Sequence, residues 1–193
     1  MRSALILGMC MTLFTAPVMA QSPNAFAINA TVNSIDAASI TLTSEDGGAV
    51  ETFRLAPTLL VLQNKAATLA DIKPNDFIAS AAVRKEDGKL HSTELRIFPN
   101  GGPGSPGEGQ FPMKDGPNRT MTNATVTGTA IVGGSNNIRV KFAGGESELV
   151  LDPGVPVIAI VPADQSLVKA GTKVRVQGVK TAEGVLINRI TVR

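Results

Sequence analysis

Histidine and cysteine, the residue types that most often serve as transition-metal ligands or catalytic groups, each occur once in this chain of 193 residues, as His91 and Cys10. Zinc and copper sites use several His or Cys ligands, so these two residues cannot assemble one. A Ser-His-Asp triad is formally possible between His91 and Ser80 or Ser92, but the chain has no nucleophile-elbow motif. We therefore expect no enzyme and no cofactor, and we interpret His91 as a strand residue that faces solvent.

Acidic residues gather in two short segments, residues 45–48 (Glu-Asp-Gly-Gly) and 86–88 (Glu-Asp-Gly). Carboxylate oxygens are ligands that hard cations prefer. Neither segment has the spaced carboxylates and carbonyls of a calcium-binding loop. Both have the composition of tight hairpin turns, and this interpretation explains them fully.

Four basic residues have the spacing of a possible anion-binding face. Arg139 and Lys141 alternate with apolar residues, and Lys173 and Arg175 do the same. Successive strand residues point to opposite faces, so all four side chains are predicted to point outward. If the two strands are neighbours, the four charges form a stripe for an anionic polymer, a lipid head group or an acidic partner. The alternative is a solvated face whose charges discourage edge pairing.

The overall charge gives little support for nucleic-acid binding. Residues 25–98 carry a net charge of −2 and residues 122–193 a net charge of +3. This asymmetry is far from the dense positive field that nucleic-acid-binding proteins use. Trp and Tyr are absent, so stacking platforms for single strands are scarce.

Residues 1–20 have the features of a secretory signal peptide. Arg2 supplies the positive start, residues 5–18 are mostly apolar, and Ala20 ends a short cleavage motif. The alternative, a membrane anchor, needs a longer apolar segment. We predict cleavage after Ala20, a periplasmic or secreted protein without a transmembrane segment, and loss of Cys10, so that the mature chain forms no disulfide.

Short alternating segments separated by turn residues predict β-strands throughout the rest of the chain. The pattern occurs twice. The motif Asn-Ala-Thr-Val at residues 29–32 returns at residues 123–126, and Pro57 returns as Pro153, at a spacing of 96 that also relates the later turns. We interpret this repetition as a tandem duplication.

Each predicted repeat holds five or six strands and one short helical turn, at residues 68–72 in the first repeat. This order suits a small OB-like barrel. We expect an all-β protein with one barrel in residues 21–98 and a second in residues 122–193. The Gly- and Pro-rich linker, residues 99–121, is expected to hold no regular element. The alternative is one two-sheet sandwich, against which the long linker argues.

The order of elements also resembles a known kind of protein. Three strands, the segment LADIKPND at residues 69–76, a strand, an Asp-Gly turn at residues 87–88 and a final strand resemble an uncharacterised family of bacterial exported barrel domains of unknown function. The resemblance covers both halves and implies a barrel fold and an exported setting. In related proteobacterial proteins a His often stands at the position of Gln110 and a Trp at that of Met113, and this chain departs at both.

These observations favour a non-enzymatic binding module of the bacterial envelope. Its expected ligand is an envelope protein or a small polyanion, with Arg139, Lys141, Lys173 and Arg175 as the candidate face. The alternative is an accessory protein of an envelope enzyme or of a metal- or cofactor-handling system.

Overall fold

A computed structural model describes residues 24–132 and 135–193. In these residues the regular structure consists of twelve strands and three single-turn 3-10 helices. The predicted all-β class is therefore confirmed. The predicted signal peptide, residues 1–20, lies outside the described residues.

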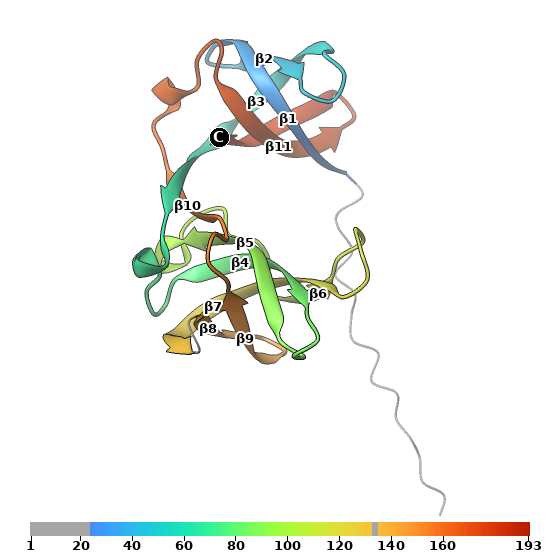
Figure 1. Cartoon of the computed structure of the whole chain (residues 1–193). Coiled ribbons are helices and arrows are strands. Elements are labelled where there is room, and N and C mark those ends of the chain that lie inside the picture. The colour runs from blue at the N-terminus through green and yellow to red at the C-terminus, as the bar shows by residue number, and fades with distance from the viewer. Residues whose placement is uncertain (1–23, 133–134) are drawn as a thin grey trace, which may run out of the picture.

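Five strands form a closed barrel, which we call ring A. They are β1 (Ala25–Ile35), β2 (Ser39–Ser44), β3 (Val50–Ala67), β11 (Lys173–Thr181) and β12 (Gly184–Val192). Their order is β12-β11-β1-β2-β3, and a parallel pairing between β3 and β12 joins the two ends. Ring A forms the upper part of the molecule in Figure 1.

The core of ring A follows from the alternation of its strand residues. On β1 the inward positions are Ala30 and Val32, which are buried, while Thr31 between them and Asn33 beside them are not. Removal of a Val, Leu or Ile side chain from water contributes about 1.5–3 kcal/mol. The cluster as a whole therefore stabilises ring A. Its buried residues are Ala30, Val32, Ile40, Leu42, Phe53, Leu55, Val61, Val168, Val174, Val176, Ile187 and Ile190.

A second group of five strands, which we call ring B, forms the lower part of the molecule (Figure 1). They are β4 (Phe77–Arg84), β5 (Leu90–Phe98), β7 (Arg119–Val132), β8 (Ser135–Phe142) and β9 (Gly145–Leu151). The group returns on itself through a short parallel ladder between β5 and β9, which pairs Leu90 with Leu149 and His91 with Val150. It has its own apolar cluster, which includes Ile78, Leu95 and Ile138.

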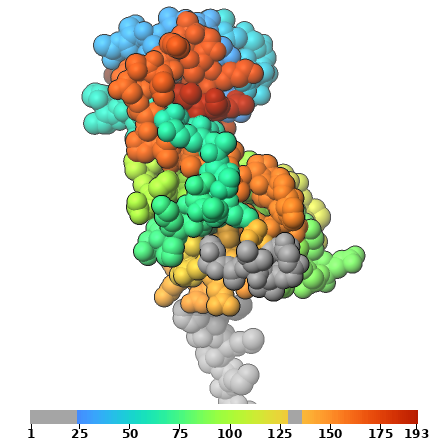
Figure 2. All heavy atoms as spheres, turned by 60° about the vertical axis from the view of Figure 1, so that its left-hand side comes forward, coloured from blue at the N-terminus to red at the C-terminus, as the bar shows by residue number. Residues whose placement is uncertain are grey.

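Each ring therefore combines strands from both sides of the linker. Strand β3 is 18 residues long; it leaves ring A and, from Leu62 to Ala67, pairs with β10 (Val157–Pro162). Strand β10 also pairs with β5 and carries the chain back towards ring A. Figure 2 shows the result on the surface, where blue-to-cyan and orange-to-red residues share the upper part of the molecule.

This pairing differs from the expectation of one barrel in residues 21–98 and another in residues 122–193. Strands β1 to β3 close with β11 and β12, whereas β4 and β5 close with β7 to β9. The physical reason is that alternation and turns determine which residues form strands and which face is buried. They do not determine which of two equivalent strands completes a ring.

The linker also differs from expectation. It contains the 3-10 turn η2 (Pro99–Gly101) and strand β6 (Gly109–Pro112), which pairs with β7. The Met113 N–H donates to the Arg119 carbonyl at 3.0 Å. Bonded residues alternate along an antiparallel ladder, so Pro112 faces away from β7 and its missing N–H costs no ladder bond.

The predicted helical turn after the third strand is confirmed in 3-10 form as η1 (Leu69–Asp71). The Thr68 N–H and hydroxyl both donate to Asp71 Oδ2, at 2.8 and 2.9 Å, which holds the start of the turn. A similar turn, η3 (Gln165–Leu167), precedes β11, and there the Ser166 N–H donates to Asp164 Oδ1 at 2.8 Å.

The strands of the two rings share their irregularities. The β1–β2 register shifts between Val32 and Ser34, and the β7–β8 register shifts between Val126 and Gly128. The β4–β5 register shifts at Ala82, and the β11–β12 register shifts at Gly178. Bulges at matching places give the two rings a residue-by-residue correspondence.

Candidate functional site

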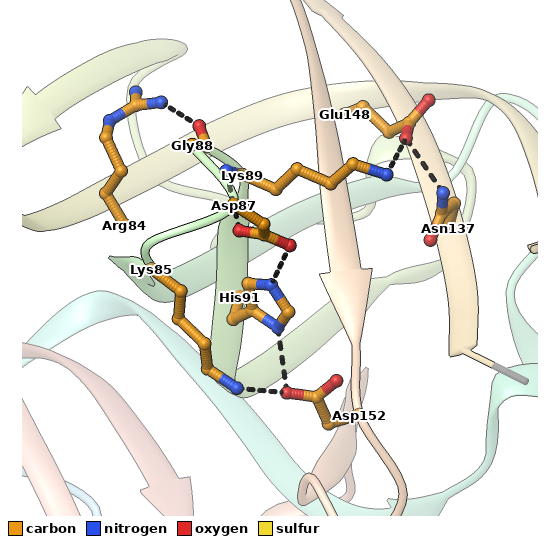
Figure 3. A network of polar contacts seen from close by, with 9 residues as sticks. All are labelled: Arg84, Lys85, Asp87, Gly88, Lys89, His91, Asn137, Glu148 and Asp152. Carbon is orange, nitrogen blue, oxygen red and sulfur yellow. Dashed lines mark hydrogen bonds and ion pairs between the residues drawn. The ribbon is translucent and has the colours of Figure 1, made fainter. Parts of the chain in front are cut away.

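A group of charged side chains surrounds His91, where β5 meets β9 (Figure 3). His91 Nδ1 lies 2.8 Å from Asp152 Oδ2, and His91 Nε2 lies 3.0 Å from Asp87 Oδ2. Lys85 Nζ lies 2.7 Å from the same oxygen of Asp152. We call Lys85, Asp87, His91 and Asp152 the His91 cluster.

Local structure brings these residues together. Asp87 lies in the turn between β4 and β5, where Gly88 has a φ of 76°, a conformation that glycine adopts without strain. The turn folds back beside β5, so Asp87 reaches His91. Asp152 directly follows β9, and the parallel pairing of His91 with Val150 places Asp152 beside the imidazole of His91. The His91 side chain is only 12% exposed, so the expectation of a solvent-facing histidine is wrong.

The cluster favours the charged form of His91. Hydrogen bonds that His91 donates to Asp87 and, to a smaller extent, to Asp152 raise the pKa of His91 above its ordinary value. The pKa of Asp87 is lowered chiefly by His91, and that of Asp152 is lowered by Lys85 and then His91. Ionised carboxylates only accept hydrogen bonds, so both contacts are hydrogen bonds when each ring nitrogen carries a proton, and this is the charged form that the raised pKa favours.

Both ring nitrogens of His91 are engaged by carboxylates. While these contacts persist, neither nitrogen is free to act as a general base. The Ser80 and Ser92 hydroxyls lie 2.8 Å from each other inside ring B, on the face of β5 opposite His91. Among residues 24–132 and 135–193 no group of His, Cys, Asp and Glu has the arrangement of a metal site. The cluster joins the β5–β9 seam electrostatically.

The four predicted basic residues all point outward, as their spacing indicated. Arg139 and Lys141 lie on β8 of ring B, and Lys173 and Arg175 lie on β11 of ring A. Strand β8 pairs with β7 and β9, whereas β11 pairs with β1 and β12. The two strands are not neighbours, so the structure forms two separate basic pairs and not one stripe of four charges.

Each pair also has polar neighbours. Arg139 Nε lies 3.9 Å from Glu148 Oε2, and Lys141 is opposite Glu146 in the β8–β9 register. The Arg175 guanidinium donates to Asn29 Oδ1 at 3.2 Å. Mixed charge on β8 and β9 weakens that surface as an anion site.

Ring A has a cavity of about 170 Å³ beside the hairpin between β2 and β3. Its walls come from three strands and the hairpin, and they combine aromatic and aliphatic side chains with two carboxylates. The lining residues are Phe26, Ile28, Leu42, Ser44, Asp46, Gly47, Ala49, Glu51 and Phe53. The Phe26 and Phe53 rings lie 5.3 Å apart.

The size of this cavity limits what it can receive. Sites for drug-sized ligands and cofactors occupy roughly 300–1,000 Å³. A cavity of about 150 Å³ holds a benzene molecule. The ring A cavity is therefore suited to one large side chain or a small organic group.

Comparison of the chain with protein families, curated proteins and solved structures found no match. Within the described part of the chain, no helix has the length and apolar character needed to span a membrane.

Sequence reasoning did not predict two features of these sites, the contact between Asp152 and His91 and the cavity of ring A. Asp152 is 61 positions from His91, so no local spacing links them, and only the parallel β5–β9 pairing does. The cavity depends on which strands close ring A. One signal was present: Phe26 and Phe53 both fall on the apolar parity of their strands, which placed two aromatic rings in the same interior.

Proposed function

We propose that this protein is an exported, non-enzymatic binding module of the bacterial envelope, and that the ring A cavity receives a group from a protein partner. The observation that carries the proposal is the cavity itself: an apolar interior, with Phe26 and Phe53 in its wall and Asp46 and Glu51 beside them, opens at the protein surface. Most barrel interiors are filled by their own side chains. The buried cluster of ring A leaves this cavity at its rim unfilled, and the mixed apolar and charged walls suit recognition.

The non-enzymatic part of the proposal rests on the His91 cluster. It contains the only histidine of the chain, and both of its nitrogens are engaged by carboxylates. The buried Ser80 and Ser92 hydroxyls bond to each other and not to a base. Export, with cleavage after Ala20 and a periplasmic or secreted location, rests on the composition of residues 1–20.

We further propose that rings A and B are two OB-like barrels that arose by duplication of one unit and exchanged their last two strands. The matching register shifts support this. The β1–β2 shift after Val32 matches the β7–β8 shift after Val126. The β11–β12 shift at Gly178 matches the β4–β5 shift at Ala82. The strand order around the two rings is the same, with β11 and β12 in ring A where β4 and β5 stand in ring B.

A polyanion is a weaker candidate than a protein partner. The four basic residues are divided between the rings, so a short polyanion contacts two of them at a time. The cavity walls carry carboxylates, which repel anions.

The test is capture of partners from the native envelope with the tagged protein and a blocked variant. Ala49 is exposed and lines the cavity, so Ala49→Trp fills its entrance. Ala182→Trp is the matched control, because Ala182 is also exposed and lies in the β11–β12 turn. The proposal expects partners that the parent and Ala182→Trp retain and that Ala49→Trp loses. Equal capture by all three proteins contradicts it.

A further inference from the structure

Strand pairing matches the cavity of ring A to a defined place in ring B. On the second and third strands, Leu42 pairs with Glu51 in ring A, and Val140 pairs with Ser147 in ring B. Glu51 therefore corresponds to Ser147.

The first strands match in the same way. Ala30 pairs with Val174 in ring A, and Ala124 pairs with Ile78 in ring B. The positions two residues earlier, Ile28 and Thr122, therefore correspond.

In ring B this place is filled. Strand β6 lies along β7, and the Gln110 side chain donates from Nε2 to Thr122 Oγ1 at 3.0 Å and to Ser147 Oγ at 3.3 Å. In ring A the corresponding residues, Ile28 and Glu51, both line the cavity. The cavity is thus the position that the Gln110 side chain occupies in the other ring.

The backbone edge beside the cavity is open as well. Strand β1 pairs with β11 from Ala25. On its other edge the first bond is at Asn29, whose carbonyl accepts from the Glu45 N–H at 2.9 Å, and the ladder with β2 follows from Ala30. In ring B, β6 pairs with β7 at residues 120–123, which correspond to residues 26–29. Ring A has no strand in this place among residues 24–132 and 135–193.

The direction of the free backbone groups follows from the ladder. The Lys180 N–H donates to the Asn24 carbonyl, and the Val32 N–H donates to the Thr172 carbonyl. Bonded residues alternate, so the even-numbered residues between them face β11. The N–H and carbonyl groups of Ala25 and Ala27 consequently point to the open edge, as those of Met121 point to β6 in ring B.

We propose that ring A binds an extended segment of a partner protein as an added strand along residues 25–28, with a Lys or Arg side chain of that segment in the cavity. This inference rests on the proposed function and specifies how the partner binds. Strand addition supplies main-chain hydrogen bonds for affinity and a side-chain pocket for specificity. Strand β6 demonstrates the geometry within the same molecule.

The cavity walls select the side chain. In ring B, Gln110 meets two hydroxyls. In ring A, Ile28, Phe26 and Phe53 are apolar and Glu51 and Asp46 are acidic. A Lys or Arg side chain has an apolar stem and a cationic end, which matches such walls. The aromatic rings add a further attraction for the cation.

The test uses a synthetic probe, a peptide with the sequence of residues 107–114 that carries Gln110→Lys. Nuclear magnetic resonance spectra of the purified protein report its binding through shifts at Ala25, Ala27 and Glu51. Two N-methylated forms of the peptide separate strand addition from simple insertion. Methylation at the residue corresponding to Phe111 removes an N–H that faces β1, whereas methylation at the Lys removes one that faces away.

We expect the first methylation to weaken binding at least about tenfold, the effect of about 1.4 kcal/mol, and the second to change it less than about threefold. On the protein side, Ala27→Pro removes the edge donor and abolishes binding, whereas Ala27→Val keeps it. Glu51→Gln weakens binding and reduces its salt dependence.

Several results overturn the inference, and they do so separately from the proposed function. If both N-methylated peptides bind equally but Ala49→Trp blocks them, the cavity binds a side chain without strand addition. If the unmodified Gln110 peptide binds as tightly as the Lys peptide, the cavity does not select a cation, and the assignment of a Lys or Arg side chain is overturned. Absence of shifts at about 1 mM peptide, a free energy near −4 kcal/mol, overturns strand addition.

Discussion

Rings A and B use the same strand order but differ at three corresponding places. A parallel pairing closes each ring, between β5 and β9 in ring B and between β12 and β3 in ring A. At this seam His91 of ring B corresponds to Leu186 of ring A. Inside, Ser80 and Ser92 correspond to Val176 and Ile187. At the mouth, Gln110 fills ring B, whereas ring A has its cavity.

The difference teaches how the two rings divide their roles. Ring B carries polar side chains at all three places and satisfies them within the chain, as a buried polar network requires. Ring A has Leu186 where ring B has His91 and is apolar inside. It leaves a mouth and a backbone edge without a partner among the described residues. This difference supports the proposal that ring A is the ring that binds.

The largest expected effect comes from Gly178 in ring A. A Cβ at this position lies 2.2 Å from the Leu186 carbonyl oxygen, a backbone atom that cannot move aside cheaply. The corresponding residue of ring B is Ala82, which has a Cβ and is buried. We expect Gly178→Ala to lower the free energy of unfolding by about 2–3 kcal/mol, measured by urea titration.

The matched control is Gly128→Ala, because a Cβ at Gly128 contacts nothing within 4 Å. It should change the free energy of unfolding by no more than about 0.5 kcal/mol. Equal effects of the two substitutions contradict the close β11–β12 contact.

The His91 cluster predicts a pH dependence that belongs to ring B. The raised pKa of His91 gives stability that is fully present below 6.5 and is lost as pH rises through the folded-state pKa. The lowered pKa values of Asp87 and Asp152 give stability that is present above 3.8 and is lost as pH falls. The contribution of the cluster is therefore greatest between these two values.

The measurement is the melting temperature of the parent and of His91→Gln across this range. We expect the difference to be largest near pH 5 to 6 and to shrink above neutrality. Glu94→Gln is the control, because Glu94 pairs with Arg96 on the exposed surface. If the difference in melting temperature does not change across neutral pH, the charged form of His91 does not stabilise the protein.

The smallest expected effect concerns the Gln110 side chain, which fills the place in ring B that corresponds to the ring A cavity. Gln110→Ala removes two side-chain hydrogen bonds, to Thr122 and Ser147. We expect a loss of about 1 kcal/mol in unfolding free energy and faster proteolysis near residues 105–114. Glu108→Ala, at an exposed position of the same segment, should leave both unchanged. Unchanged proteolysis in Gln110→Ala would show that the Gln110 side chain does not hold this segment against ring B.

The sequence predicted local structure well and pairing poorly. Alternation placed Ile138, Val140, Val174 and Val176 inward, and Thr68 was identified as the start of a turn; the structure confirms both. These properties depend on neighbours in the chain. The regular strand in the linker was missed because Pro112 lies where a donor is not needed.

The exchange of strands and the two sites depend on contacts between distant residues. Asp152 reaches His91 only because β9 pairs with β5. The basic residues failed to form one stripe because β8 and β11 belong to different rings. The exchanged and the non-exchanged pairing both place the same alternating residues inside a barrel. Alternation therefore cannot show which of the two pairings forms.

Strand exchange between the rings underlies the whole comparison, and engineered disulfides test it most directly. In the exchanged arrangement Asn29 lies opposite Arg175, and Ala79 lies opposite Asn123. A barrel formed by residues 21–98 alone would place Asn29 opposite Ala79. Residues in such non-hydrogen-bonded antiparallel pairs have Cα atoms about 4.5 Å apart, within the range that a disulfide spans.

We predict that Asn29→Cys with Arg175→Cys, in a Cys10→Ser background, forms an intramolecular disulfide that mass spectrometry detects after proteolysis. Asn29→Cys with Ala79→Cys should remain reduced under the same conditions. Cross-linking of the second pair and not of the first would contradict strand exchange and the comparison between the two rings.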